Sequence, residues 1–128
     1  MTEFFKVFGE LATRCAVKVL KLNLSDDTYR IIHSTKGEYK SKSPFLKDWI
    51  KECCDKELIH PDYAEGLIHL TDLDFLNKTF KYKDYIHFKF KRCSYQGCEY
   101  RNNVLTILPV RDDNPLKYCY VVVYDIDE

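Results

Sequence analysis

The sequence has little glycine, no surplus of charge of either sign and no phosphate-binding motif. Four of its 128 residues are glycine, and 20 Lys and Arg residues are balanced by 20 Asp and Glu residues. A generic nucleic-acid-binding domain is normally basic, so the balance argues against that class. Lys89, Lys91 and Arg92 form a local basic cluster, which we interpret as the solvated face of a strand. The glycines are too scattered for a P-loop or a dinucleotide-binding turn.

Long apolar runs and an export signal are missing as well. No stretch approaches the roughly 20 apolar residues of a membrane-spanning helix. The first six residues lack the basic start and apolar core of a signal peptide. We therefore expect a cytoplasmic chain, and we expect its six cysteines to be reduced thiols, not disulfides.

The chain is instead rich in hydrophobic residues, which make up 45% of it, and in aromatic residues, which make up 15%. This composition and length suit one globular domain with a single core. The most strand-like run is residues 118–127, which are β-branched or aromatic with no charge before Asp125. Both faces of this run are apolar, so we expect it in the middle of a sheet.

The N-terminal segment predicts an amphipathic helix that flanks the domain. Within residues 1–15, Phe4, Phe8 and Leu11 recur at helical spacing and form one narrow apolar stripe. The stripe could pack on the sheet of its own chain or on a second copy of the chain. Because an apolar stripe left in water is unfavourable, we expect it to form a homodimer interface.

Five later segments predict strands. Residues 16–24 and 28–34 alternate on either side of a Ser-Asp-Asp turn, as in a hairpin. Residues 85–93, 99–110 and 118–127 are joined by tight turns, as in a meander. The residues between the hairpin and the meander are helical. We therefore expect an α+β fold, with a five-stranded antiparallel sheet and short helices on one face.

The helical middle of the chain has recognisable starting signals. Ser43 and Pro44 predict the N-cap and first residue of one helix, and Pro61 predicts the first turn of the next. The run from Thr71 to Asp74 resembles a capping box with Asp in place of Glu, which predicts a third helix.

Three segments resemble PAS domains of bacterial sensor proteins. The run His60-Pro61-Asp62 resembles the His-Pro-(Glu/Asp) sequence that opens the helical segment of such domains. Residues 82–97, followed by Tyr100 and Arg101, resemble the third and fourth strands with their hairpin. The ending Asp125-Ile126-Asp127 resembles an Asp-Ile-Thr type of ending, where the last strand continues into a signalling helix. The resemblance implies a PAS-like sheet and a PAS-like domain over residues 16–128.

Two positions depart from the PAS pattern. Asp127 replaces a frequent threonine, so the hydroxyl group at that position is missing. Asn102 and Asn103 stand where many relatives have tryptophan followed by an apolar residue. A ligand contact made by that tryptophan would therefore be absent from this chain.

The resemblance implies a non-catalytic sensory module that binds a small ligand or a partner and relays the event to an output domain. In such bacterial signalling proteins the output is a GGDEF (diguanylate cyclase) domain or a histidine kinase. Asp125, Ile126 and Asp127 would carry the signal relay. From the facing of the predicted elements, we expect the ligand pocket to be lined by Trp49, His69, Phe75, Phe88 and Phe90.

The sequence does not identify a cofactor. The Asn-Cys-Arg-Phe-like run of flavin-binding relatives and the Gly-Gly-(Asp/Glu)-Glu-Phe run of the cyclases are both absent. Haem would need an axial ligand, for which His69 is a better candidate than His60, although a lone histidine is more often structural. Cys93 and Cys98 flank a turn, but zinc would need further ligands, so free thiols are the favoured interpretation.

A second hypothesis is a small cytosolic ligand carrier or enzyme of similar build, which uses a cavity under the sheet. His87, Tyr85 and Glu99 would then be acid–base groups. On an alternating strand, however, His87 points away from Ile86 and Phe88. If those apolar residues form the core, His87 lies in solvent and this hypothesis loses its best residue.

Overall fold

The structure is a computed structural model that describes residues 16–111 and 115–126. Asp127 and the helix predicted within residues 1–15, with Phe4, Phe8 and Leu11, lie outside the described residues. The elements in chain order are strands β1 (Ala16–Asn23) and β2 (Tyr29–Ser34), helices α2 (Leu46–Asp55), α3 (Pro61–Leu70) and α4 (Leu73–Thr79), and strands β3 (Ile86–Arg92), β4 (Arg101–Val110) and β5 (Tyr118–Asp125).

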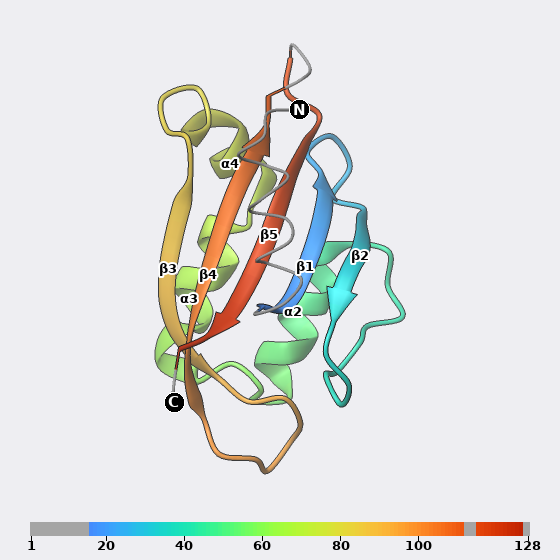
Figure 1. Ribbon diagram of the computed structural model, residues 1–128, viewed down its shortest axis with the longest axis vertical. Coiled ribbons are helices and arrows are strands. Elements are labelled where there is room, and N and C mark those ends of the chain that lie inside the picture. Colours follow the sequence, from blue (N-terminus) through green and yellow to red (C-terminus); the bar gives the residue numbers. More distant parts are fainter. Residues whose placement is uncertain (1–15, 112–114, 127–128) are drawn as a thin grey trace.

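The strands form one five-stranded sheet in the order β2-β1-β5-β4-β3. All neighbouring strands are antiparallel. Strand β5 lies in the middle, between β1 and β4 (Figure 1). The sequence predicted this central position because both faces of the closing strand are apolar. In agreement, Val122 and Cys119 of β5 are fully buried.

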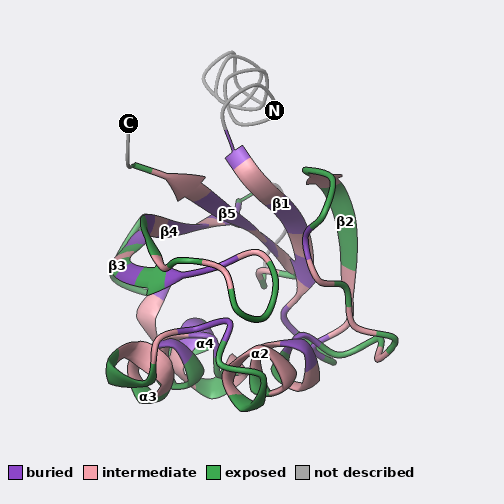
Figure 2. Cartoon of the chain, turned by 90° about the horizontal axis from the view of Figure 1, so that it is seen from below, coloured by how far each residue is buried: buried purple, intermediate pink, exposed green. Residues whose placement is uncertain are grey.

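Helices α2, α3 and α4 all cover the same face of the sheet (Figure 2). The main hydrophobic core lies between these helices and the sheet, and it includes Leu20 and Leu22 of β1, Ile107 of β4 and Leu76 of α4. The predicted α+β fold, with a five-stranded antiparallel sheet and short helices on one face, is confirmed. Among the described residues, no helix is long and apolar enough to cross a membrane.

Strand β3 shows the alternation that the sequence predicts. Ile86 and Phe90 are buried, whereas His87 and Lys89 between them are exposed. Helix α3 approaches this strand closely at Gly66, where an added Cβ would lie 3.0 Å from Cζ of Phe88. The small residue therefore allows α3 to sit directly on the aromatic face of β3.

Two of the predicted helix starts are displaced. Helix α2 begins at Leu46, not at Pro44, because Phe45 is held extended in a bridge to Thr28. Ser43 still accepts a hydrogen bond from the backbone N–H of Phe45 at 3.2 Å.

The cap of α4 is displaced by one residue, while the start of α3 is as predicted. Asp72, not Thr71, is the N-cap of α4 and accepts from the N–H of Phe75 at 3.1 Å. Thr71 is instead the C-cap of α3, because its hydroxyl group donates to the carbonyl of Leu67 at 2.8 Å. Helix α3 begins at Pro61.

The turn between β3 and β4 depends on Gly97. Its φ of +89° lies in the left-handed region, and an added Cβ would meet no atom within 4 Å. A Gly97→Ala change therefore tests backbone conformation alone, and we expect it to lower the free energy of unfolding by about 1 kcal/mol. Urea unfolding measures this loss. The adjacent Gln96→Ala variant, at an exposed position without positive φ, is the control, and equal stability of the two variants would contradict the prediction.

Candidate functional site

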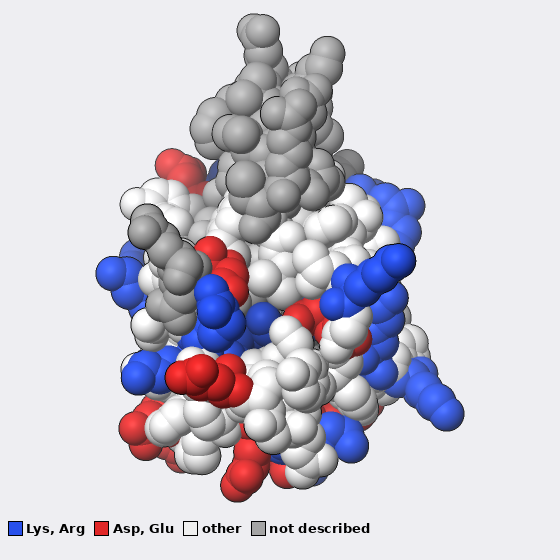
Figure 3. All heavy atoms as spheres, turned by 60° about the horizontal axis from the view of Figure 1, so that its bottom comes forward, with Lys and Arg blue, Asp and Glu red and all other residues white. Residues whose placement is uncertain are grey.

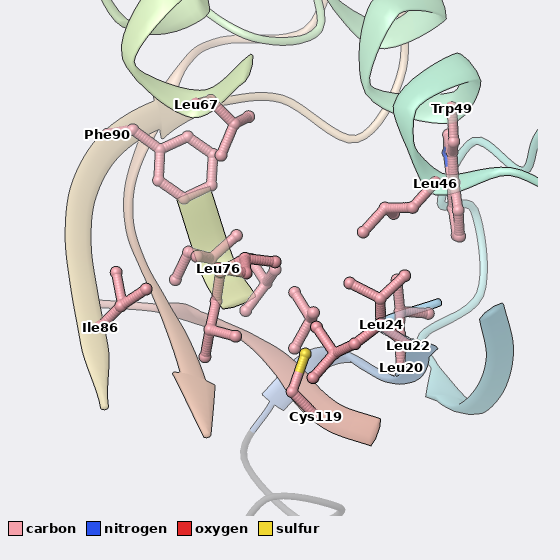
Figure 4. Close-up of a cluster of buried hydrophobic side chains, with 14 of the residues drawn as sticks. Leu20, Leu22, Leu24, Leu46, Trp49, Leu67, Leu76, Ile86, Phe90 and Cys119 are labelled. Carbon is pink, nitrogen blue, oxygen red and sulfur yellow. The ribbon is translucent and has the colours of Figure 1, made fainter. Parts of the chain in front are cut away.

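A cavity of about 60 Å³ lies between the sheet and helices α2 and α3. Leu67 and Phe90 stand on one side of this space, and Leu46 and Trp49 stand on the other (Figure 4). Most of the wall is aliphatic or aromatic. The remaining apolar lining residues are Leu20, Ile50, Leu58, Ile59, Leu105, Val121 and Val123.

One end of the cavity carries a buried charged cluster of Lys18, Glu38 and Arg92. Both cations converge on Oε1 of Glu38: Arg92 Nη2 donates a short hydrogen bond to it, and Lys18 Nζ lies 3.7 Å from it. The side chains of Lys18, Glu38 and Arg92 are only 13%, 2% and 10% exposed. Arg92 Nη1 also donates to Oδ1 of Asn103 at 3.4 Å.

Strand alternation explains why these polar side chains enter the core. Lys18 shares the face of Leu20 and Leu22, and Arg92 shares the face of Phe90. Asn103 lies in the same phase as the buried Leu105 and is 1% exposed. Three strands therefore each contribute one polar residue at the same end of their core-facing sides.

The ammonium group of Lys18 lies between the carboxylate of Glu38 and the ring of Trp49. Its Nζ lies 4.3 Å from the centroid of the Trp49 ring, a cation–π contact. Burial lowers the pKa of Lys18, and the positive charge of Arg92 lowers this pKa further. Nε1 of Trp49 is buried and has no hydrogen-bond acceptor among the described residues.

Glu38 reaches the cavity from the loop between β2 and α2, and this loop is fixed by Glu52 of α2. The Tyr39 hydroxyl group donates to Oε1 of Glu52 at 2.5 Å, and Ser41 donates to Oε2 at 2.8 Å. The first of these bonds raises the pKa of Tyr39 to about 12. The loop therefore places a carboxylate against the ends of β1 and β3.

Two thiols at the cavity are poor nucleophiles. Burial raises the pKa of Cys53 to about 11. Burial and a hydrogen bond to the neighbouring Cys98 raise the pKa of Cys93 to about 12. Both thiols are therefore protonated at neutral pH. Within residues 16–111 and 115–126, the cysteines are free and no group of three or more potential metal ligands occurs.

The element order and strand order are those of a hairpin and a meander joined by helices, with the closing strand between the first and fourth strands. A five-stranded antiparallel sheet with short helices on one face is the fold that the resemblance to PAS domains implied. No family model matches the sequence, and no curated protein matches it. Among solved structures, the PAS domain of Bordetella pertussis BvgS is similar, with a TM-score of 0.49 and 11% identity over 99% of this chain and 89% of that chain.

The structure separates the five residues that the sequence assigned to a ligand pocket. Trp49 and Phe90 line the cavity. Phe88 stacks beside Phe90, with the ring centroids 5.8 Å apart, but does not line the cavity. His69 is exposed near the end of α3, and the centroids of the His69 and Phe75 rings are 4.5 Å apart. Neither residue lines the cavity.

The basic cluster of β3 is only partly a solvated face, contrary to the sequence interpretation. Lys89 and Lys91 are exposed, but Arg92 is buried because it follows Phe90 by two residues and shares its phase. On the end of the molecule seen in Figure 3, basic and acidic side chains are interspersed with neutral ones.

The described relay residues lie where β5 leaves the sheet. Arg101 Nε donates to Oδ2 of Asp125 at 2.5 Å. The N–H of Ile126 donates to the carbonyl of Asn102 at 3.0 Å, so the chain remains attached to β4 beyond the end of β5.

The residues of the enzyme hypothesis lie outside the core. His87 is exposed, and its Nδ1 is 2.9 Å from the Thr106 hydroxyl oxygen. Tyr85 is also exposed, and the centroids of the Tyr85 and His87 rings are 4.7 Å apart. Glu99 is exposed in the turn before β4. His60 is the N-cap of α3 and accepts from the N–H of Asp62 at 3.1 Å.

Sequence reasoning missed the charged end of the cavity. Three of its residues could have been recognised from the sequence, because each is a polar residue at a position where the strand alternation predicts an apolar one. They are Lys18, Arg92 and Asn103. Glu38 carries no such signal. It lies in a polar loop, and only the folded chain brings this loop to the sheet.

Proposed function

We propose that the chain is a non-catalytic sensory module that binds a small ligand in the cavity beneath its sheet. The observation that carries the proposal is the composition of the cavity wall. Val121 and Val123 of the central strand β5 line it, and buried charges stand at the end where β5 leaves the sheet. An apolar space with a few convergent polar groups is the usual form of a small-molecule site.

Two physical connections link the cavity to the end of β5. Val123 is two residues before Asp125 on the same strand. Arg92 contacts Asn103, which pairs with Asp125 in the register of β4 and β5. A ligand that moves Arg92 or Val123 would therefore alter the surroundings of Asp125.

The proposed relay runs from the cavity through Asp125, Ile126 and Asp127 to an output domain. A ligand shifts such a switch only when it binds one conformation of the module more tightly than the other. A GGDEF domain or a histidine kinase would provide the output in a bacterial signalling protein, with residues 16–128 as its cytoplasmic sensory domain.

Filling the cavity tests the proposed ligand site. Leu67 lines the cavity and is 3% exposed, whereas the adjacent Ile68 is 48% exposed. In a screen of metabolites by thermal unfolding, we expect a compound that stabilises the wild type but not Leu67→Trp. The same compound should stabilise the control Ile68→Trp.

Circular dichroism would check that Leu67→Trp folds, since overpacking costs about 1–3 kcal/mol. The site would be disproved if no metabolite stabilises the wild type. It would also be disproved if Leu67→Trp responds like Ile68→Trp.

We also propose that residues 1–15 form a flanking helix that pairs two copies of the chain through Phe4, Phe8 and Leu11. The helical spacing of these residues supports the proposal. Sedimentation velocity should show a dimer that dissociates in a Phe4→Glu, Phe8→Glu variant. A wild type that stays monomeric at high concentration would refute this assembly.

A further inference from the structure

The charged groups that line the cavity do not balance. Within the described residues they are the cations Lys18 and Arg92 and the carboxylate Glu38, so two positive charges face one negative charge. An uncompensated charge away from water is costly, and proteins normally pair it. The surplus of one positive charge is therefore the chemical feature that a ligand of this cavity would meet.

We infer that the cavity binds a short-chain carboxylate, whose charge is held by Lys18 while Glu38 stays paired with Arg92. This inference rests on the proposed ligand site and names the class of its ligand. The added anion would bring the cluster to two positive and two negative charges.

The geometry identifies Lys18 as the group that holds the ligand. Its Nζ stands 3.7 Å from Glu38 Oε1, which is longer than an ordinary N–H···O hydrogen bond of about 2.7–3.2 Å. Arg92 takes the close contact with the same oxygen. The ammonium group has three N–H donors, so it can bind a second carboxylate without breaking the Arg92–Glu38 pair.

A bound carboxylate would also change the protonation of Lys18. Its pKa is lowered first by burial and then by Arg92. The other groups that face it are Glu38 from the loop and Cys53 from α2, and both act in the opposite direction. A bound anion would add to that opposing effect and favour the charged ammonium form.

The size and lining of the cavity limit the rest of the ligand. A water molecule needs about 10–15 Å³ of such space, so 60 Å³ accommodates roughly four to six non-hydrogen atoms. Acetate, propionate and butyrate fall in this range. Leu46, Leu67 and Val121 provide an apolar wall that suits a short alkyl chain.

The test compares propionate with propionamide, which has the same shape without the charge, by isothermal titration calorimetry at constant ionic strength. We expect propionate to bind with a dissociation constant of about a millimolar or tighter, and propionamide at least tenfold more weakly. Lys18→Met should weaken propionate binding at least about tenfold, while Lys18→Arg, which retains the charge, should restore most of it. Lys21→Met, a lysine of the same strand outside the cavity, should bind like the wild type.

Equal binding of propionamide and propionate would overturn the anion inference but leave the ligand site standing. Unchanged propionate binding in Lys18→Met, or no propionate binding to the wild type, would overturn it as well. The proposed site itself is decided separately, by the metabolite screen on Leu67→Trp and Ile68→Trp.

Discussion

Arg92→Met should lower the free energy of unfolding by about 3–5 kcal/mol, because it leaves the buried carboxylate of Glu38 without its closest cation. Methionine keeps much of the side-chain length, so the loss reports charge more than volume. Arg92 also donates to Asn103, and this bond is lost as well. Urea unfolding at neutral pH, followed by circular dichroism, measures the effect.

Two further variants separate the buried ion pair from general effects on β3. Lys91→Met changes the adjacent exposed lysine and should stay within about 0.5 kcal/mol of the wild type. In the double variant Glu38→Gln, Arg92→Met, no unpaired carboxylate remains, so part of the lost stability should return. A loss below about 1 kcal/mol for Arg92→Met would mean that Glu38 is not buried as described.

Phe80→Ala should also cost about 3–5 kcal/mol of unfolding free energy, since it opens a large void in the main core. Phe80 is 1% exposed and follows the last residue of α4, a helix of seven residues. Such a short helix is held by packing and not by intrinsic helix propensity. Thermal and urea unfolding together measure the change.

Tyr82→Ala, two residues further along, is the matched control because Tyr82 is 84% exposed. It should unfold within about 0.5 kcal/mol of the wild type. If Phe80→Ala proved no less stable than Tyr82→Ala, the packing of α4 against the sheet would be incorrect.

The sheet could be predicted because each of its strands has an alternation or an apolar run that stands out locally. The middle position of β5 followed from the absence of charge on either face before Asp125. Helix starts were less predictable because tertiary contacts move them. A bridge between Thr28 and Phe45 delays α2 until Leu46, and no local residue pattern announces that bridge.

The cavity was only partly predictable, for a related reason. Trp49 lies on the broad apolar face of α2, and Phe90 belongs to the regularly alternating apolar residues of β3. Both residues line the cavity. His69 lies near the end of α3 and Phe75 lies in the seven-residue helix α4, and neither residue lines the cavity. The partner of Arg92 could not be predicted, since Glu38 is 54 residues away in a loop.

A ligand in the cavity should act on the C-terminal end of β5, and a nuclear magnetic resonance titration tests this coupling most directly. With labelled valine methyl groups and backbone amides, propionate should shift Val121, Val123 and the amides of Asp125 and Ile126 along one binding curve. Val122, which packs on the opposite side of the sheet with Ala16 and Val19, should shift much less. Absence of these shifts, or shifts confined to exposed residues, would contradict the account.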